Sequence, residues 1–330
     1  MRIADGSVEV FDITAGQWIG IKTDIVVAVP AIDPPEEILA AQQLRVPKDS
    51  EGFFLELHPK LGPVETSSQG VLIAGVAQGP KDVKESSIQA LAAASKAAAI
   101  LANPYLEKEP FIPVINPYKC TKCMRCAEAC PYNAIRGELR KWIEVIPGLC
   151  QGCGACVAEC NVEGAITIPG FTDEQILAQI DAALAENPER KVLVFACNWC
   201  SYAGADLAGI LKIQYPPSSR VIRTMCSARV SQKMVLHAFR RGAGAVLITG
   251  CWPQDCHYNY ANLNTKKRYE RWLRILEARG IRRERLQLHW ISAAEAKRFA
   301  EKMTEAHQLV EKLPVDEVRE TVKKLEGVKA

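Results

Sequence analysis

Thirteen cysteines are the residues of this sequence best suited to chemistry, and all of them fall between residues 120 and 256. Eight form a repeat, because the spacing C-x2-C-x2-C-x3-C occurs at residues 120–130 and again at residues 150–160. Thiolates bind zinc and iron–sulfur clusters, and regular spacing of this kind favours metal binding. The odd total also excludes complete disulfide pairing within the chain.

This repeated spacing is typical of a two-cluster bacterial ferredoxin module. Three thiolates two residues apart wrap a tight loop around a cubane cluster, and the fourth begins a short helix that points at the other cluster. The pattern therefore predicts two [4Fe–4S] clusters with exchanged fourth ligands. The first would be bound by Cys120, Cys123, Cys126 and Cys160, and the second by Cys130, Cys150, Cys153 and Cys156. Two structural zinc sites are the alternative, although zinc usually takes two separated C-x2-C pairs.

The two copies differ after their last cysteine. Pro131 follows Cys130, as the ferredoxin pattern requires, whereas Asn161 follows Cys160 and one extra residue precedes Ala165. The ligands themselves are unaffected. We therefore expect a different local turn there, and with it a different potential for the cluster that Cys160 binds.

The other five cysteines lie in a segment that alternates predicted helices and strands. A helix is expected from an N-cap at Thr172 to about residue 187, because acidic residues fill its first turn. Apolar runs predict four strands, over residues 191–196, 220–225, 243–250 and 286–290. Such alternation indicates an α/β domain with a parallel sheet and helices on both faces.

Each of these five cysteines follows one of the first three strands. They are Cys197, Cys200, Cys226, Cys251 and Cys256. Since the carboxyl ends of parallel strands share one sheet edge, the five thiols should lie together there. Four thiolates would hold a cluster, and the absence of ferredoxin spacing favours [2Fe–2S]. A zinc site, a dithiol exchange centre at Cys197 and Cys200, and buried cysteines acting as small apolar residues are the alternatives.

Aromatic and basic side chains flank these thiols in the sequence. The aromatic ones, expected to pack around the site and exclude water, are Trp199, Tyr202, Trp252 and His257. His257 is also a weak candidate ligand. Arg223 and Arg229 bracket Cys226, where they would either offset the negative charge of a cluster or lie on solvated surface.

Composition bounds the remaining possibilities. The 330 residues are 48% apolar and 24% charged, which is globular, and the net charge of +3 does not suggest nucleic-acid binding. No apolar run is long enough to span a membrane, and no export signal is evident, so we expect a cytoplasmic protein. Nine Lys and Arg residues between residues 266 and 285 predict a solvated helix face or, second, a docking surface for an acidic partner.

Residues 196–206, 223–230 and 250–258 carry a resemblance that continues through residues 284–286 and 290–299. Over about 140 residues, the sequence resembles the delta iron–sulfur subunit of methyl-viologen-reducing hydrogenase. This resemblance implies a [2Fe–2S] cluster. It also implies electron transfer between a hydrogenase or similar dehydrogenase and heterodisulfide reductase.

Residues 50–64 and 70–82 resemble the A subunit of heterodisulfide reductase, a flavoprotein with a thioredoxin-reductase-like domain followed by ferredoxin modules. Only the closing part of that flavin domain has a counterpart here. It comprises expected strands over residues 24–30 and 70–75 and a helix from about residue 85 to 101. The Gly-rich dinucleotide loop is missing, and Val76 replaces a cysteine of the family.

The flavin contacts that this resemblance implies are Gly75 and the amides of Val76, Ala77 and Gln78. FAD would then be shared with a partner chain that supplies the dinucleotide loop. The alternative is a flavin-free docking domain.

Four regions follow from these patterns. They are a partial flavin-type domain over 1–108, a two-cluster ferredoxin module over 109–170, a hydrogenase delta-like [2Fe–2S] domain over 171–308 and a helical tail over 309–330. We expect the tail to cover this chain's own core or to dock on a partner.

Together these regions indicate a non-catalytic or co-catalytic electron-transfer subunit of a heterodisulfide-reductase-type oxidoreductase complex. The implied partners are a flavin-containing A-type subunit, B- and C-type subunits, and a hydrogenase, formate dehydrogenase or other dehydrogenase. Any flavin-based bifurcation belongs to the complex. The alternatives are a quinone-interacting oxidoreductase or methylenetetrahydrofolate reductase assembly, a thiol–disulfide oxidoreductase and a zinc-stapled scaffold.

Overall fold

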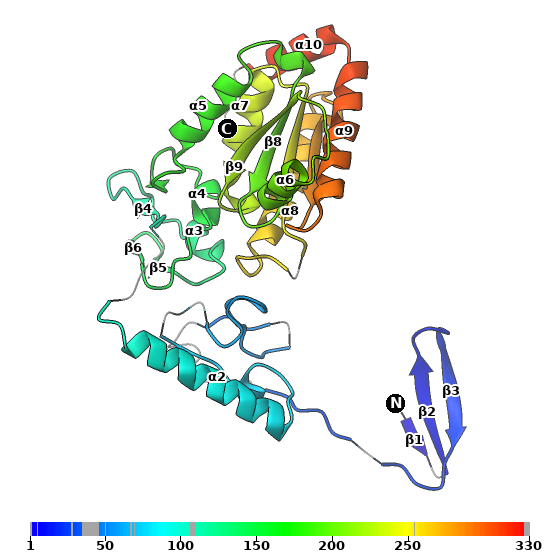
Figure 1. The fold of residues 1–330 in the computed structure, drawn as a ribbon. Coiled ribbons are helices and arrows are strands. Elements are labelled where there is room, and N and C mark those ends of the chain that lie inside the picture. The colour runs from blue at the N-terminus through cyan, green and yellow to red at the C-terminus, as the bar shows by residue number, and fades with distance from the viewer. Residues whose placement is uncertain are drawn as a thin grey trace. The chain divides into compact units, whose positions relative to one another are not determined.

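The computed structural model describes residues 2–4, 6–27, 29–34, 46–49, 51–66, 68, 70–105, 110–253 and 255–326 (Figure 1). The chain divides into two compact units, Met1–Glu36 and Glu37–Ala330. The first unit is an antiparallel sheet of β1 (Arg2–Ala4), β2 (Ser7–Asp12) and β3 (Gln17–Lys22). These three strands were not predicted, although residues 7–12 and 17–22 flank a turn that Gly16 permits with a φ of 65°.

The strand predicted over residues 24–30 is wrong. The described residues of this segment lie in no strand, and the Ile25 and Val27 side chains are 81% and 80% exposed. An apolar run becomes a strand only where a neighbouring strand can accept its backbone hydrogen bonds, and the described residues offer this segment none.

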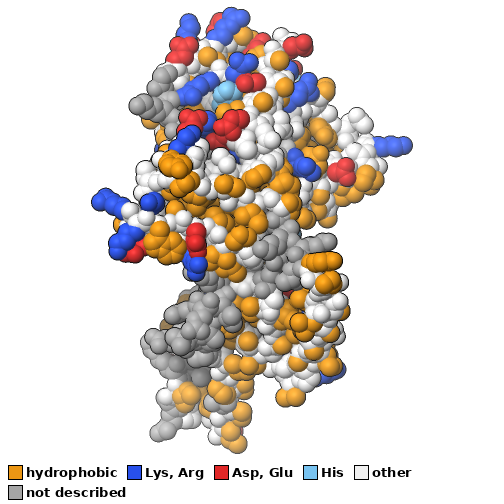
Figure 2. Space-filling model, turned by 90° about the vertical axis from the view of Figure 1, so that its left-hand side faces the viewer, with side chains coloured by type: hydrophobic (Ala, Val, Ile, Leu, Met, Phe, Trp, Pro, Cys, Tyr) orange, Lys and Arg blue, Asp and Glu red, His pale blue; other side chains and the backbone are white. Residues whose placement is uncertain are grey.

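The strand predicted over residues 70–75 is also wrong. Its only ladder contact among the described residues is a single bridge between Glu65 and Leu72, followed by the 3-10 turn η1 (Gly75–Ala77). The predicted helix is confirmed as α2 (Val83–Leu101), which Asp82 and Glu85 begin with a reciprocal capping box. No residue of α2 is buried. Figure 2 shows hydrophobic side chains exposed on one face of the molecule, beside lysine, arginine, aspartate and glutamate side chains.

Two short helices and two small antiparallel pairs make up the ferredoxin region. The helices are α3 (Arg125–Glu128) and α4 (Ala155–Ala158), one in each copy of the cysteine repeat. The pairs are β4 (Val114–Ile115) with β7 (Ile166–Thr167), and β5 (Ile135–Glu138) with β6 (Trp142–Val145). The β4–β7 pair joins the start of the module to its end, which closes it around both cysteine motifs.

The predicted parallel sheet is confirmed. Its strands are β8 (Val192–Cys197), β9 (Ser219–Thr224), β10 (Ala245–Gly250) and β11 (Leu286–Trp290), and all neighbours are parallel in the order β11-β10-β8-β9. Alternate residues face two cores. Leu193 and Phe195 face the core that α5 (Asp173–Ala183), α7 (Gln232–Arg240) and α8 (Ala261–Glu277) share, whereas Val192 and Val194 face the core that α9 (Ala296–Lys312) covers. Figure 1 shows α5 and α7 on one side of the sheet and α9 on the other.

The helices of this part are α5 (Asp173–Ala183), α6 (Ser201–Ile210), α7 (Gln232–Arg240), α8 (Ala261–Glu277), α9 (Ala296–Lys312) and α10 (Val315–Leu325). Short 3-10 turns are η2 (Pro188–Arg190), η3 (Ser227–Arg229) and η4 (Arg283–Arg285). Thr172 caps α5 as predicted. None of the helices in the described ranges combines the length and apolarity needed to cross a bilayer.

The tail is a helix that belongs to this chain's own core. Helix α9 continues to Lys312, past the expected boundary at residues 308 and 309, and α10 follows after Pro314. Val318 and Leu325 of α10 are buried, and Leu325 packs in the core with α7. Of the two roles expected for the tail, covering this chain's own core is therefore the one seen.

Two buried arginines lie where the ferredoxin region meets the sheet domain. Arg229 donates to the Phe171 carbonyl at 2.8 and 3.0 Å and to an Asp173 carboxylate oxygen at 2.7 Å. Arg268 donates to Glu159 of the second cysteine motif at 2.6 Å, and to the Ala228 carbonyl. Both side chains are buried. Neither Arg229 nor Arg268 therefore lies on the solvated surface that was one of the locations expected for it.

We expect Arg229→Ala to lower the free energy of unfolding by about 3 kcal/mol, because it leaves Asp173 and a buried carbonyl without their donor. Arg223→Ala is the matched control, since Arg223 brackets Cys226 from the other side but is exposed. Its cost should stay below about 0.5 kcal/mol. Anaerobic denaturant titration of the intact chain measures both, and equal costs would contradict the clamping role of Arg229.

Candidate metal centres

The four cysteines expected to share the first cluster line one cavity. Cys120, Cys123, Cys126 and Cys160 surround it together with apolar residues that include Ile143 and Ile166. Cys126 lies in the first turn of α3, whereas Cys160 comes from the other copy, just after α4. The side chains are thus arranged as the spacing predicts, with the fourth cysteine of this cavity contributed by the other copy.

The other four cysteines line a second cavity. Cys130, Cys150, Cys153 and Cys156 surround it with Tyr132 and Ile135. Cys130 comes from the first copy, immediately after α3, and the other three belong to the second copy. Each cavity therefore has the ligand set of one cubane cluster, four thiols in mostly apolar walls.

Tight loops before α3 and α4 present the thiols in both copies. Lys122 and Met124 of the first copy take left-handed backbone angles (φ 56° and 64°), where the second copy has Gly152 and Gly154 (φ 73° and 76°). This conformation is costly for lysine and methionine and free for glycine. Because both copies adopt this left-handed conformation, the loop requires it whichever residue stands there.

Backbone amides point at several of these sulfurs. Lys122 N–H lies 3.4 Å from Cys120 Sγ, and Gly152 N–H lies 3.5 Å from Cys150 Sγ, at equivalent positions of the repeat. Amide donors stabilise the negative charge of thiolates and of reduced clusters. The loops therefore position and stabilise the same sulfurs.

The copies differ where the sequence departs from the ferredoxin pattern. Cys130 Sγ accepts a hydrogen bond from the Ala134 amide at 3.3 Å, whereas Cys160 Sγ donates to the Val162 carbonyl at 3.5 Å. With the extra residue before Ala165, the backbone of Val162 meets the sulfur of Cys160, whereas the amide of Ala134 meets that of Cys130. The two cavities therefore differ in the backbone contacts of this cysteine.

The five remaining thiols meet at the carboxyl edge of the parallel sheet, as expected. Cys197 ends β8, Cys200 precedes α6, Cys226 precedes η3, and Cys251 and Cys256 follow β10. All five are buried. The sulfurs of Cys197, Cys200 and Cys251 lie within 4.8 Å of one another, and those of Cys197 and Cys251 are 3.9 Å apart. Cys226 lies close enough to Cys197 and Cys256 for their thiols to raise its pKa.

Side chains from the neighbouring elements fix the turns that carry these thiols. The Ser201 hydroxyl accepts from the Cys197 amide at 2.9 Å and from the Thr249 hydroxyl at 2.8 Å. Asn262 of α8 donates to the carbonyls of Cys251 and Trp252 at 2.9 and 3.0 Å. Cys200 is also the N-cap of α6, where the helix dipole favours negative charge.

Burial and crowding make several of these thiols hard to ionise on their own. Burial raises the pKa of Cys126 to about 11, with neighbouring thiols adding to the effect, and burial also raises the pKa of Cys153 and Cys200. The pKa of Cys197 shifts the other way, because hydrogen bonds from Cys200, Cys226 and Cys251 lower it. A bound cation would supply the positive charge that lets several thiolates coexist, so these donor sets fit metal centres.

A buried hydroxyl gives an independent test of that fit. Tyr132 is 1% exposed, and its hydroxyl has no hydrogen-bond partner in the described structure. Its ring meets Tyr258 edge to face, with centroids 6.5 Å apart, and burial beside Cys153 and Cys256 raises its pKa, so the proton stays on the oxygen. An unsatisfied donor among thiols indicates an acceptor that a cluster's sulfur atoms would supply.

Aromatic side chains do not seal the site in the way expected from sequence. Trp199, Tyr202 and Trp252 are each about 40% exposed. His257 stacks on Trp199 with centroids 3.9 Å apart and lies outside the close group of thiols. The sealing residues are instead Tyr132 and Tyr258, which sequence reasoning missed although each lies within two residues of a cysteine.

The second cavity and the five-thiol site belong to one continuous buried cluster. It contains Cys130, Cys153 and all five cysteines of the sheet edge, with Tyr132 and Tyr258 among them. The first cavity packs against a different core, through Cys126 and Cys160, and Cys156 of the second cavity lies in that core as well. The second cavity is thus the one that adjoins the sheet-edge thiols.

Two of the expected flavin contacts, the amides of Gly75 and Gln78, are engaged with protein groups. Gly75 N–H donates to Gln89 Oε1 at 2.7 Å, and the Gln78 side chain donates to Glu56 at 2.7 Å and also meets Gln89. The Ala77 carbonyl accepts from the Phe54 amide at 3.0 Å, and Val76 is partly exposed. These contacts leave the flavin role of this segment a prediction.

Comparison with protein families divides the chain in the same way as its cysteines. Residues 113–136 and 147–163 each match a 4Fe–4S binding domain, and residues 192–314 match the family of the methyl-viologen-reducing hydrogenase delta subunit. The chain therefore carries two ferredoxin-type 4Fe–4S motifs.

The iron–sulfur D subunit of the F420-non-reducing hydrogenase vhc from Methanococcus voltae is 41% identical over 143 residues, which are 43% of this chain and 99% of that protein. The chain belongs to the hydrogenase delta-subunit family. The iron–sulfur D subunit of an F420-non-reducing hydrogenase from Archaeoglobus profundus is 40% identical over 39% of this chain and 95% of its own length.

A longer relative covers most of the chain. The A subunit of the ferredoxin:CoB-CoM heterodisulfide reductase from Methanosarcina mazei is 40% identical over 284 residues, or 86% of this chain. The chain spans 36% of the length of that relative. Both resemblances inferred from the sequence are confirmed, one to the delta subunit of the hydrogenase and the other to the A subunit of heterodisulfide reductase.

Removing the orphaned hydroxyl with Tyr132→Phe should shift the midpoint potential of a neighbouring cluster by roughly 20–60 mV to more negative values, because a hydrogen bond to sulfur stabilises the reduced state. In the metal-free chain the same change should cost no stability. Tyr269→Phe is the control, since its hydroxyl already donates to the Leu286 carbonyl at 3.1 Å. Redox titration followed by EPR measures the shift, and unchanged potentials at both neighbouring sites would refute this role.

Proposed function

We propose that this chain relays electrons in a heterodisulfide-reductase-type complex, through two [4Fe–4S] clusters in the ferredoxin region and one [2Fe–2S] cluster at the sheet edge. Iron–sulfur clusters supply one-electron transfer without a substrate pocket. The observation that carries the proposal is the buried continuity of the second cavity with the five-thiol site. The relatives support it, since they are heterodisulfide reductase A subunits and hydrogenase iron–sulfur subunits.

The proposed ligands are those expected from the spacing. Cys120, Cys123, Cys126 and Cys160 would hold one cubane cluster, Cys130, Cys150, Cys153 and Cys156 the other, and four of Cys197, Cys200, Cys226, Cys251 and Cys256 the [2Fe–2S] cluster. Around them the chain excludes water with Tyr132 and Tyr258 and directs amides at sulfur. Electrons would then cross between the sheet edge and the first cavity by way of the second.

The partners follow from the two ends of this relay. We propose that a hydrogenase, formate dehydrogenase or other dehydrogenase docks at the sheet domain, and that a flavin-containing A-type subunit, with its B- and C-type subunits, docks at the N-terminal region. Exposed apolar side chains support the second contact, because Ile25 and Val27 are exposed and α2 buries no residue. The cytoplasm is the proposed compartment, as free buried thiols suit a reducing environment.

Metal analysis of the intact chain tests the relay. We expect about ten irons with matching sulfide, and split EPR signals from [4Fe–4S] and [2Fe–2S] centres after reduction. About eight irons would leave Cys197 and Cys200 free for disulfide exchange, and zinc without iron would favour a scaffold; either result would overturn the proposal.

Matched serine variants test the exchange of fourth ligands. Cys160→Ser should remove the same EPR signal as Cys123→Ser, and Cys130→Ser the same signal as Cys153→Ser, each with a loss of about four irons. Because Cys160 and Cys153 lie in the same copy of the repeat, a signal lost by both of their variants would contradict the exchange.

We further propose that the N-terminal region contacts FAD only together with a partner chain, or docks without flavin. Gly75, Val76, Ala77 and Gln78 would be the contacts, although two of them already bind protein groups. The chain purified alone should therefore contain less than stoichiometric flavin by absorbance. Stoichiometric flavin in that sample would overturn both versions.

A further inference from the structure

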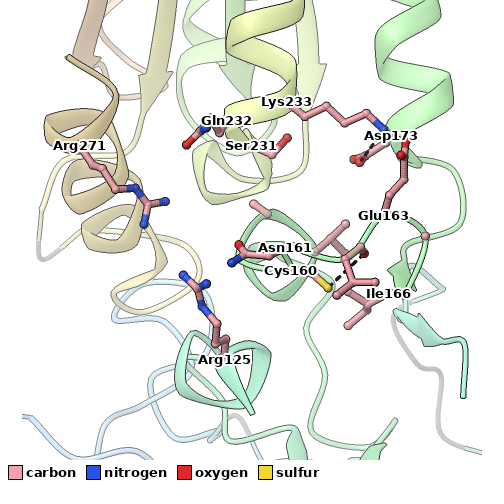
Figure 3. A pocket seen from close by; sticks show the side chains of 14 residues that line it. Arg125, Cys160, Asn161, Glu163, Ile166, Asp173, Ser231, Gln232, Lys233 and Arg271 are labelled. Carbon is pink, nitrogen blue, oxygen red and sulfur yellow. Dashed lines mark hydrogen bonds and ion pairs between the residues drawn. The ribbon is translucent and has the colours of Figure 1, made fainter. Parts of the chain in front are cut away.

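A cationic pocket lies beside the first cavity and has no part in the relay described above. Its walls come from α3, the loop after α4, the N-terminus of α7 and the middle of α8. Cys160, one of the proposed cluster ligands, forms part of its wall (Figure 3). Whatever occupies this pocket therefore lies next to the first cluster site.

Two arginines from different elements point into this pocket. Figure 3 shows the guanidinium groups of Arg125 and Arg271 directed into the same space, with the side-chain amide of Asn161 directed there as well. In the described part of the chain, neither guanidinium has a hydrogen bond or ion pair to a protein group. Two guanidinium groups that converge without a counter-ion form a binding site for oxygen anions, carboxylates above all.

The acidic residues of the pocket do not neutralise these arginines. Glu163 and Asp173 line the opposite side, where Lys233 pairs with both of them. Asp173 also accepts from the buried Arg229 at 2.7 Å. The positive charge of Arg125 and Arg271 is therefore available to a ligand from outside.

The position of this pocket favours a segment of another protein as its ligand. Of the thirteen cysteines, all of which are described, only Cys123 is exposed, and it belongs to the first cavity. A relay must bring one cluster close to a partner's redox centre, and the first cavity is the one nearest to solvent. Arg271 is itself exposed, so a partner's surface can reach the pocket without rearrangement.

We propose that an acidic segment of a redox partner docks its carboxylates on Arg125 and Arg271, beside the first cluster site. The inference rests on the proposed function. It gives a role to one residue of the basic stretch 266–285, in which Arg268 and Arg285 are instead buried. A carboxylate bound here would add negative charge next to Cys160 and so disfavour reduction of the adjacent cluster.

A fluorescent hexaglutamate peptide and the intact, cluster-loaded chain test this surface by anaerobic fluorescence anisotropy. Arg125→Gln and Arg271→Gln should each weaken binding by about tenfold, because each removes a charge-assisted contact. Arg274→Gln on the same helix is the control, since this exposed arginine lies outside the pocket. It should change binding by less than about twofold.

Equal losses in all three variants would overturn the proposal in favour of general attraction to a basic surface. Displacement of the peptide by inorganic phosphate at matched ionic strength, but not by chloride, would overturn it in favour of a small-anion site. If Arg125→Gln loses iron, its peptide binding no longer tests the pocket. Arg271→Gln is then the deciding variant, because Arg271 lies on α8, outside the cysteine loops.

Iron content and EPR of the same samples test the relay separately. If the variants keep their clusters but Arg125→Gln and Arg271→Gln bind the peptide as well as the wild type does, the docking site is wrong and the relay is unaffected. If the wild-type chain itself contains no clusters, the relay is wrong. The Cys123→Ser variant identifies the EPR signal of the first cluster. When the peptide binds, the midpoint potential of this cluster should move to more negative values in the wild type and should not move in Arg271→Gln.

Discussion

The crowding of thiols in dry protein is the constraint on which this structure depends. Burial holds most of these thiols in their protonated form, and thiolates packed this closely would repel one another. A positive metal centre removes both costs, and it converts a destabilising cluster of polar groups into a set of bonds. The amides at Cys120 and Cys150, the N-terminus of α6 and the orphaned hydroxyl of Tyr132 all favour negative charge on sulfur.

The same constraint explains why the ferredoxin region and the sheet domain are joined so firmly. Water between the second cavity and the five-thiol site would raise the local dielectric and interrupt their common core. Arg268 crosses that boundary with its bond to Glu159. Arg229, which bonds to Asp173 on the sheet-domain side, packs so closely against the second cysteine motif that a Cβ on Gly154 would lie 2.6 Å from its Cδ. Two domains that look separate in sequence therefore share a boundary that neither could bury alone.

Sequence reasoning succeeded where the information is local. Ligand grouping follows from cysteine spacing, and β8 to β11 follow from apolar runs, three of which end at cysteines. It failed where a partner far along the chain decides the outcome. Nothing near Arg229 or Arg268 in sequence indicates that these charges are buried, and the surroundings of Tyr132 include Cys256 and Tyr258, which lie more than 120 residues further along the chain. The β1–β3 sheet was missed for another reason, since its strands are short and mix polar with apolar residues.

The wrong strand over residues 24–30 carries physical information of its own. Ile25, Val27 and Val29 have the composition of a buried strand, yet they are exposed, and the described residues of this segment pair with no strand. Helix α2 repeats the pattern, because it is rich in alanine, well capped and without a buried residue. Apolar surface of this kind is stable in water only when something covers it. Local sequence preference and observed exposure thus disagree over the described residues of the N-terminal region, which is where a flavin-containing partner is proposed to dock.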